Sequence, residues 1–510
     1  MPVAFNNMPA VIRTGLFFAE INAGSPPYSG ISTQILIGHK LTGGSAPVGV
    51  LQPLGGQDPN ALFGAGSILA DMAQYARWHD PVGAIYVLPV AEPGGGGADT
   101  RTLTFTAATA AGTLVRYIAG EKVSIPVAAG DTAAAIATRF AAAVNAGYVR
   151  FNKRMLWTVT AAAVAAVVTL TSRHAGTVGK QVRVEAGLEG NEVDPAGVTV
   201  TVATGTVGTG DVDVAAALAF LNTIPATWIT SAFEATTTIL NATSLYLSDA
   251  GGGGWSPTVQ KRGHFTSVLG GNLAALTAFG AARNDPHATI LGAQNFPHPL
   301  WCIAAALNGV IARSKNIGAG LTEAIEISRP LQTLPLQGIR PPKVDLDRFN
   351  RPDRETLLQS GISTFTVDHA GVVRLERIIT TYLTNAAGAL DTTFLDIETM
   401  AQSMYIASYL RQRVETTYPR HVLLDRNPGT LQGVVTPDSA RATVVHAYNE
   451  LYQAGIVEKP ELIAKYLIVE RSSDGNRLNC FLPADVANQL RVFAANITLY
   501  TEFDPNRQAA

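Results

Sequence analysis

Strand-like and helix-like segments alternate along residues 31–314, and this alternation constrains the fold more than any other feature. Short runs of β-branched and apolar residues are followed by segments with an apolar residue every three or four positions. Such a chain forms a mainly parallel sheet with helices on both faces. The predicted strands cover residues 31–38, 84–88, 227–231, 264–269 and 288–291. The predicted helices cover residues 67–78, 213–222, 234–247, 272–282 and 300–314.

A different pattern interrupts the alternation between residues 98 and 209. The interruption is bounded by Gly94–Gly97 on one side and by the sequence TGTVGTG on the other. Inside it, strand candidates surround one helix at residues 131–145, for which Asp131 is the expected N-cap. We interpret residues 98–209 as a β-rich α+β domain inserted in a loop, with an outward-facing position expected. The α/β middle domain then comprises residues 31–97 and 210–328.

The last third of the chain has a third type of organisation. Residues 329–350 are rich in proline and are expected to link the middle domain to an α+β C-terminal domain at residues 351–488. A long helix is predicted at Asp396–Tyr418, and Thr436-Pro437 is the expected start of another. Strands are predicted at residues 462–470 and 477–482.

Both ends of the chain carry apolar strand candidates. From Phe493 onward alternate residues share one face, which is typical of a half-buried strand. A long apolar edge that stays free is an aggregation hazard, so this strand must pair within its own chain or in the sheet of another subunit. Residues 14–22 form a similar candidate, and the sequence NAGSPPYSG that follows it reads as a hinge. We therefore interpret residues 1–30 and 489–510 as terminal arms.

Charge and cysteine content exclude several classes of protein. Charged residues make up 15% of the 510 residues, against roughly 25% in average soluble domains, which indicates that partners cover much of the surface. The formal net charge of −2 gives no sign of nucleic-acid binding. The two cysteines suggest no disulfide framework. No signal peptide is evident, and the most apolar run, at residues 161–170, is too short to span a membrane, so we expect a soluble protein made in a cytoplasm.

Glycine-rich loops provide no convincing phosphate site. The sequence at Gly176–Gln181 resembles part of a nucleotide-binding loop, but its glycines are too close together and Gln181 replaces the magnesium-binding hydroxyl. A turn before a strand at residues 181–185 is the better interpretation. Gly64–Ser67 could hold an anion at a helix N-terminus, although Ser67 as an ordinary N-cap is preferred.

Histidines and carboxylates provide no convincing catalytic or metal site. His298 and Cys302 would lie one helical turn apart, but two ligands do not make a zinc site. His287 is better explained as a capping or packing residue. Asp396 and Glu398 lead a helix, where carboxylates favour the positive end of the dipole. We therefore expect no catalytic residue, metal or cofactor.

Seven segments from residue 283 onward carry a family resemblance: RNDPHAT at residues 283–289, RPLQTLPLQGI at 329–339, LLQSGISTFTVD at 357–368, ERIITTYLTNAAGALDTTFLDIET at 376–399, TYPRH at 417–421, LIVERSSDGNR at 467–477 and LPADVANQLRVFAANI at 482–497. They resemble the tail sheath proteins of Mu-like contractile-tailed bacteriophages. Weaker likeness, including IGHK at residues 37–40, extends it over most of the chain, whereas the insertion departs most easily from relatives.

The resemblance implies a structural protein of the virion that is assembled in the host cytoplasm. Sheath proteins form stacked hexameric rings around a tail tube protein and also meet baseplate and tail terminator proteins. On triggering, the sheath shortens and drives the tube through the host envelope. The family's C-terminal domain lies nearest the tube, and both terminal arms complete a sheet in neighbouring subunits.

These implications select candidate interaction residues. The N-terminal arm would act through Leu16, Phe17, Phe18 and Ile21, and the C-terminal arm through Phe493, Ile497, Leu499, Tyr500 and Phe503. Arg411 and Arg413 are candidates for contact with the tube. Two other functions stay open at this point: the sheath of a phage-derived bacteriocin or injection device, and an α/β enzyme with its active site at the carboxyl ends of the strands.

Overall fold

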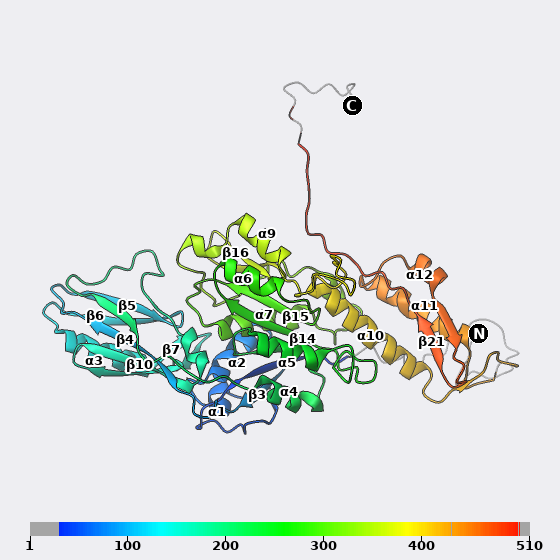
Figure 1. Cartoon of the computed structure of the whole chain (residues 1–510), viewed down its shortest axis with the longest axis horizontal. Coiled ribbons are helices and arrows are strands. Elements are labelled where there is room, and N and C mark those ends of the chain that lie inside the picture. The colour runs from blue at the N-terminus through cyan, green and yellow to red at the C-terminus, as the bar shows by residue number, and fades with distance from the viewer. Residues whose placement is uncertain (1–29, 430, 498, 500–510) are drawn as a thin grey trace, which may run out of the picture.

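The computed structural model describes residues 30–429, 431–497 and 499 (Figure 1). Its centre is a six-stranded sheet in the order β15-β14-β13-β1-β3-β2, in which all neighbours are parallel except β2 and β3. The strands are β1 (Thr33–His39), β2 (Gln52–Pro53), β3 (Ala84–Val90), β13 (Trp228–Ser231), β14 (His264–Gly270) and β15 (Ala288–Ala293). The α/β class predicted from the alternation is confirmed.

Helices cover this sheet because its central strands are apolar on both faces. Every residue of β1, β13 and β15 is buried, as expected for parallel strands between two layers. Helices α2 (Ile68–His79) and α7 (Leu300–Ser314) pack against each other and against the sheet. The remaining helices of this region are α1 (Pro59–Phe63), α4 (Val214–Ala219), η2 (Phe220–Thr223), α5 (Thr237–Leu247), α6 (Leu273–Ala281) and α8 (Ile325–Ser328).

Side-chain caps set most of the helix starts. The Ser67 hydroxyl accepts a hydrogen bond from the Ala70 amide at 3.1 Å, so Ser67 is the N-cap of α2 as predicted. The start predicted for α5 was three residues too early, because Thr236 caps this helix. Glu234 lies outside α5, and its carboxylate accepts from the Gly270 amide instead.

The insertion forms two antiparallel sheets and one longer helix, at the left of Figure 1. The first sheet has the order β12-β4-β10-β9 and the second β11-β5-β6, with the hairpin β7-β8 beside them. Their bounds are β4 (Ala98–Phe105), β5 (Gly112–Ile118), β6 (Glu121–Val127), β7 (Tyr148–Arg150), β8 (Lys153–Met155), β9 (Val159–Val164), β10 (Val167–Ala175), β11 (Val184–Glu185) and β12 (Val200–Thr204). The Gly97 amide donates to the Thr209 carbonyl, so the two ends of the insertion lie side by side.

The cap of the insertion's helix corrects one prediction. Helix α3 (Ala133–Ala146) is capped by Thr132, whose hydroxyl accepts from the Ala135 amide. Asp131, the predicted cap, instead accepts from the Ala128 amide and from the Arg139 guanidinium. The sequence Asp131-Thr132 offers two capping residues in a row, and local pattern alone does not choose between them.

The C-terminal part begins against the central sheet and then extends away from it along α10 (Figure 1). Ser363 and Thr380 make bridges to β15, so the hairpin of β16 (Thr364–Val367) and β17 (Val373–Arg377) packs on the α/β body. Beyond α10 (Ile397–Thr417), α11 (Pro437–Gln453) begins after the Thr436 cap, as predicted. The other elements are η3 (Asp345–Arg348), α9 (Arg351–Gln359), β18 (Val422–Leu423), β19 (Val434–Val435), α12 (Pro460–Tyr466), β20 (Ile468–Arg471) and β21 (Leu478–Phe481).

The first part of the Pro-rich residues 329–350 contacts β17: the Thr333 amide donates to the Leu375 carbonyl, and Leu336 is buried. One expectation for this part differs from the structure. The strand predicted at residues 462–470 is wrong in its first half, which forms α12. Pro460 opens this helix and Ile463 is its buried residue, whereas only Ile468–Arg471 pairs with β21.

Candidate subunit-interaction site

Residues 485–487 attach the C-terminal segment to the body of the subunit, shortly before the chain projects from it. The Ala487 amide donates to the Ile456 carbonyl at 3.0 Å, and the Ala487 carbonyl accepts from the Gln402 side-chain amide at 2.8 Å. Two residues earlier, the Asp485 amide donates to the Tyr448 hydroxyl. These hydrogen bonds hold residues 485–487 against α10 and α11.

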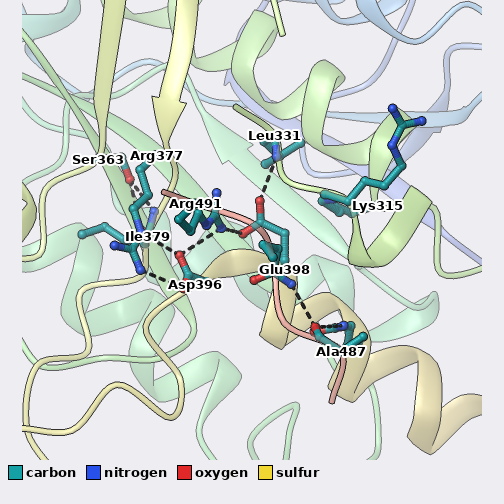
Figure 2. A network of polar contacts seen from close by, with 12 residues as sticks. Lys315, Leu331, Ser363, Arg377, Ile379, Asp396, Glu398, Ala487 and Arg491 are labelled. Carbon is teal, nitrogen blue, oxygen red and sulfur yellow. Dashed lines mark hydrogen bonds and ion pairs between the residues drawn. The ribbon is translucent and has the colours of Figure 1, made fainter. Parts of the chain in front are cut away.

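An ion cluster at the start of α10 completes this attachment (Figure 2). One terminal nitrogen of Arg491, Nη2, lies 2.7 Å from Glu398 Oε2 and 3.1 Å from Asp396 Oδ1. Arg377 of β17 forms a bidentate pair with Asp396, with both N–O distances at 3.0 Å. The other oxygen of Glu398 accepts from the Leu331 amide at 2.8 Å. We call Arg377, Asp396, Glu398 and Arg491 the root cluster.

Local sequence places the two carboxylates of the root cluster. Asp396 occupies the N-cap position of α10, and Glu398 lies in its first turn. The positive end of a helix dipole stabilises negative charge at these positions. Glu398 is buried completely, and such a charge needs cationic partners and hydrogen bonds. Arg491 and the Leu331 amide supply them.

Lys315 adds a further buried cation beside the root cluster (Figure 2). It follows α7, and its ammonium donates to the carbonyls of Glu326 and Arg329. Burial lowers the pKa of Lys315 to about 8, because the low-dielectric interior disfavours the charged form. The negative charge of Glu398 opposes this shift, and the positive charge of Arg491 adds to it.

The C-terminal end of the described chain leaves the body as an extended segment (Figure 1). Residues 491–497 form no strand with any described residue, so the predicted terminal strand is not formed within this part of the chain. Its apolar side chains are exposed, among them Phe493 at 86% and Leu499 at 90%, and Ile497 is exposed as well. Such a run of exposed apolar residues is typical of a surface that another chain covers.

The sheet formed by β20 and β21 has two strands only among the described residues. Each of these strands therefore has an edge without a described neighbour, and Ile468 and Phe481 are exposed on the sheet. A two-stranded hairpin is marginally stable alone in water, and its free edges are suited to accept a further strand.

The structure brings only part of the predicted set together. Phe493, Ile497 and Leu499 share the exposed C-terminal segment. The other arm residues, Leu16, Phe17, Phe18, Ile21, Tyr500 and Phe503, lie outside the described residues.

The two candidate tube-facing arginines differ in their surroundings. Arg411 is exposed and pairs with Glu415 one turn further along α10, at 2.8 Å. Arg413 is partly covered, and its guanidinium lies 3.4 Å from Glu450 of α11. Arg413 thus bridges two helices, whereas Arg411 lies on the outer surface of one.

Residues considered for metal or anion chemistry have structural partners. His298 Nδ1 accepts from the Arg340 amide, and burial lowers the pKa of His298 to about 3. The Cys302 thiol donates to Asp71, and burial raises its pKa. His287 lies 3.2 Å from Asp249 and stacks on Trp255. No cluster of metal-ligating side chains occurs among residues 30–429, 431–497 and 499.

The carboxyl ends of β13, β14 and β15 border a cavity of about 660 Å³, where an α/β enzyme would hold its active site. Glu234 is its half-buried acid, and burial raises the pKa of this carboxyl. One of its oxygens already accepts the Gly270 amide. The segment Gly176–Gln181 was predicted to be a turn. Its residues 177–181 form the short helix η1 (Thr177–Gln181), which borders the same cavity.

Among the helices of the described residues, none has the length and apolar character needed to span a membrane.

Comparison with known proteins identifies the family. Residues 208–381 match the phage tail sheath protein central domain, and residues 390–500 match the phage tail sheath C-terminal domain. The chain is 31% identical over 504 residues to the Mu-like prophage FluMu tail sheath protein of Haemophilus influenzae, covering 97% of this chain and 99% of that protein. The chain belongs to the phage tail sheath family. Its function is that of a structural subunit of a contractile tail sheath.

Two solved structures of sheath proteins show a distant likeness to this chain. The sheath tail protein of Desulfitobacterium hafniense is 14% identical with a TM-score of 0.46, covering 92% of this chain and 97% of that one. The contracted helical sheath of the anti-feeding prophage is 10% identical with a TM-score of 0.47, covering 98% and 100%.

The sequence did not predict that Arg491 forms ion pairs with Asp396 and Glu398 in this sheath protein. Its partners Asp396 and Glu398 precede it by 95 and 93 residues. The helix-start positions of the two acids were recognised, but no local pattern links them to an arginine so far along the chain.

Proposed function

We propose that this sheath protein assembles as stacked hexameric rings around a tail tube and that exchanged terminal segments hold neighbouring subunits together. Contraction of this lattice drives the tube through the host envelope. Baseplate and tail terminator proteins lie at the two ends of the lattice. Assembly takes place in the host cytoplasm before the tail joins the virion.

The exposed C-terminal segment carries this proposal. Residues 492–497 and 499 present apolar side chains for which the described chain offers no cover. Strand addition to a neighbour's β20–β21 sheet would bury them and pair their backbone groups. Each added hydrogen bond contributes roughly 0.5–1.5 kcal/mol net, so about six residues together with their apolar contacts make a durable joint.

The N-terminal arm is proposed as the second partner in this exchange. Leu16, Phe17, Phe18 and Ile21 would supply apolar contacts as the C-terminal residues do. A strand from each end would convert the two-stranded sheet into a larger one with a hydrophobic face, which is the condition for independent stability.

The arrangement of domains around the tube is part of the same proposal. Residues 351–488 would lie nearest the tube and residues 98–209 outermost, with the α/β domain between them. Arg411 is the better candidate for tube contact, because its guanidinium is exposed and the one ion pair it forms with a described residue is the exposed i,i+4 pair with Glu415. Arg413 would contribute indirectly, by holding α10 against α11.

Contraction of such a lattice needs no chemical step in the subunit. Assembly on the tube would trap a packing of higher free energy, and release at the baseplate would let the subunits repack while the exchanged strands stay paired. The role is therefore mechanical rather than enzymatic, and no cofactor takes part in it.

Truncation tests the exchange of the C-terminal segment. Removal of residues 492–510 should leave a folded, soluble subunit that forms no sheath on tubes in electron micrographs. Removal of residues 505–510 alone is the matched control and should permit assembly, because it leaves Phe493 to Phe503 in place. Normal sheaths from the longer truncation would refute the exchange.

A further inference from the structure

Arg491 marks the boundary between the attached and the projecting part of the C-terminal segment. Upstream of it, Asp485 and Ala487 are hydrogen-bonded to α11 and α10 or their flanking loop. Downstream, residues 492–497 are all exposed, and none of them forms a hydrogen bond or ion pair with a described residue. The change occurs within one residue, and Figure 1 shows the C-terminal end of the described chain projecting from the body.

The two acids of the root cluster depend on Arg491 to different extents. Asp396 also has the bidentate pair with Arg377. Glu398 is buried, and Arg491 forms its ion pair at 2.7 Å. Arg491 therefore joins the C-terminal segment to both acids at the start of α10.

Arg491 is also incompletely satisfied where it lies. Its Nη2 atom serves both carboxylates, while its Nε and Nη1 atoms are buried without an acceptor among the described residues. A buried donor without a partner costs free energy. The cost of these two unpaired donors offsets part of the stabilisation from the two ion pairs of Nη2.

We propose that Arg491 is a positioning residue that fixes where and in which direction the C-terminal segment leaves the subunit, so that the bending required during contraction is confined to residues 492–497. This proposal rests on the exchange of that segment proposed above. In this proposal the six residues 492–497 form the flexible joint between subunits. The root cluster forms the rigid attachment point of the segment, which we call the mount.

The root cluster has the connections that a mount needs. Arg491 reaches Asp396, which is tied to Arg377 of β17, and Glu398, which is tied to the Leu331 amide (Figure 2). Ser363 and Thr380, on either side of the β16–β17 hairpin, bridge to β15, and Leu331 is buried in the hydrophobic core. A pull that a neighbour exerts on the segment would therefore pass into the α/β body, and not only into the hairpin β20–β21.

The variant Arg491→Gln tests the mount, since it removes the ion pairs and keeps a polar side chain. Hydrogen exchange of the purified subunit should show the Ala487 amide losing protection at least tenfold, with β20, β21 and α11 unchanged. Arg491→Lys keeps one charged contact and should show an intermediate loss. Tails assembled with Arg491→Gln should contract at a lower urea concentration than wild-type tails, because the segment no longer leaves in a fixed direction.

Arg420→Gln is the matched control, because it removes one exposed arginine near the far end of α10. It should leave both measurements unchanged. Unchanged Ala487 protection in Arg491→Gln would overturn the proposal, even where that variant assembles poorly. If truncation of residues 492–510 prevents assembly while Arg491→Gln behaves as wild type in both measurements, the exchange stands and the mount fails. If the truncated chain assembles normally, the exchange itself fails.

Discussion

Asp71 of α2 and Arg150 of β7 form an ion pair that is buried where the insertion meets the α/β sheet. Only 8% and 6% of their side chains are exposed. Asp71 also accepts from Trp301 Nε1 at 2.8 Å, and the Arg150 guanidinium lies 4.1 Å from the centre of the Tyr75 ring. Burial raises the pKa of Asp71, but Arg150 and these donors outweigh it and hold the pKa below its usual value. The insertion is thus tied to α2 by a charged contact, and Trp301 of α7 donates to the same carboxylate.

Breaking this pair should destabilise the subunit strongly. Arg150→Met leaves Asp71 buried without its cation, which costs about 3–5 kcal/mol of unfolding free energy. Urea unfolding of the unassembled protein measures it. The double variant Asp71→Asn/Arg150→Met should recover part of the loss, and Arg154→Met, at an exposed neighbour on β8, should cost far less. A similar loss in Arg154→Met would mean that the buried pair is not the cause.

Acid should weaken the subunit through its buried histidines. Burial lowers the pKa of His39 and His79 to about 4 and of His264 and His298 to about 3. Below pH 6.5 the unfolded chain therefore binds more protons than the folded one, and stability falls as the pH falls toward 4. Each histidine contributes about 1.4 kcal/mol per pH unit in this window. Urea midpoints at pH 7 and pH 5 measure the slope, which His446→Asn, at an exposed position, should not change.

Lys315 should make the stability of the subunit depend on pH in the alkaline range. Its pKa of about 8 in the folded state lies below the ordinary value of 10.5. Between these values the unfolded chain binds the extra proton, so this residue's contribution to stability increases as the pH rises from about 8 toward 10.5. Lys315→Met should remove this rise, whereas Lys465→Met, which lies on α12, should preserve it. A profile that is equally steep in both variants would contradict the assignment.

Gly280 permits the close approach of α6 to the residues after α9. A methyl group there would lie 2.2 Å from the Ser360 carbonyl oxygen, which is closer than atoms can approach. Gly280→Ala should therefore cost about 1–3 kcal/mol of unfolding free energy through overpacking. Gly94→Ala places its methyl group in open space and is the control. Equal urea midpoints for the two variants would show that this contact adjusts freely.

Charge reversal tests contact with the tube. Arg411→Glu should weaken sheath–tube association in low salt, because an exposed attraction becomes a repulsion that salt screens. Co-sedimentation of sheath with purified tubes measures it. Arg413→Glu is less selective, since it faces Glu450 and would disturb the packing of α10 on α11. Unchanged sedimentation of Arg411→Glu at every salt concentration would point to another element.

Features set by neighbouring residues were predictable from the sequence. The predicted bounds of α7, the predicted cap Ser67 and the predicted helix start at Thr436-Pro437 all agree with the structure. These features depend on hydrogen bonds and side-chain periods within a few residues. Two errors show the limit of that reasoning. Asp131 does not cap α3 because it accepts from the Ala128 amide and from Arg139. The strand predicted at residues 462–470 overlooked Pro460, which opens α12.

The sequence by itself therefore determined the α/β alternation, most element positions and the resemblance that named the family. Only the tertiary structure decided which charges meet: Arg150 with Asp71, 79 residues away, and Arg491 with Glu398, 93 residues away. Contacts at such separations depend on how the sheet, the insertion and α10 pack together, and no local pattern records that packing.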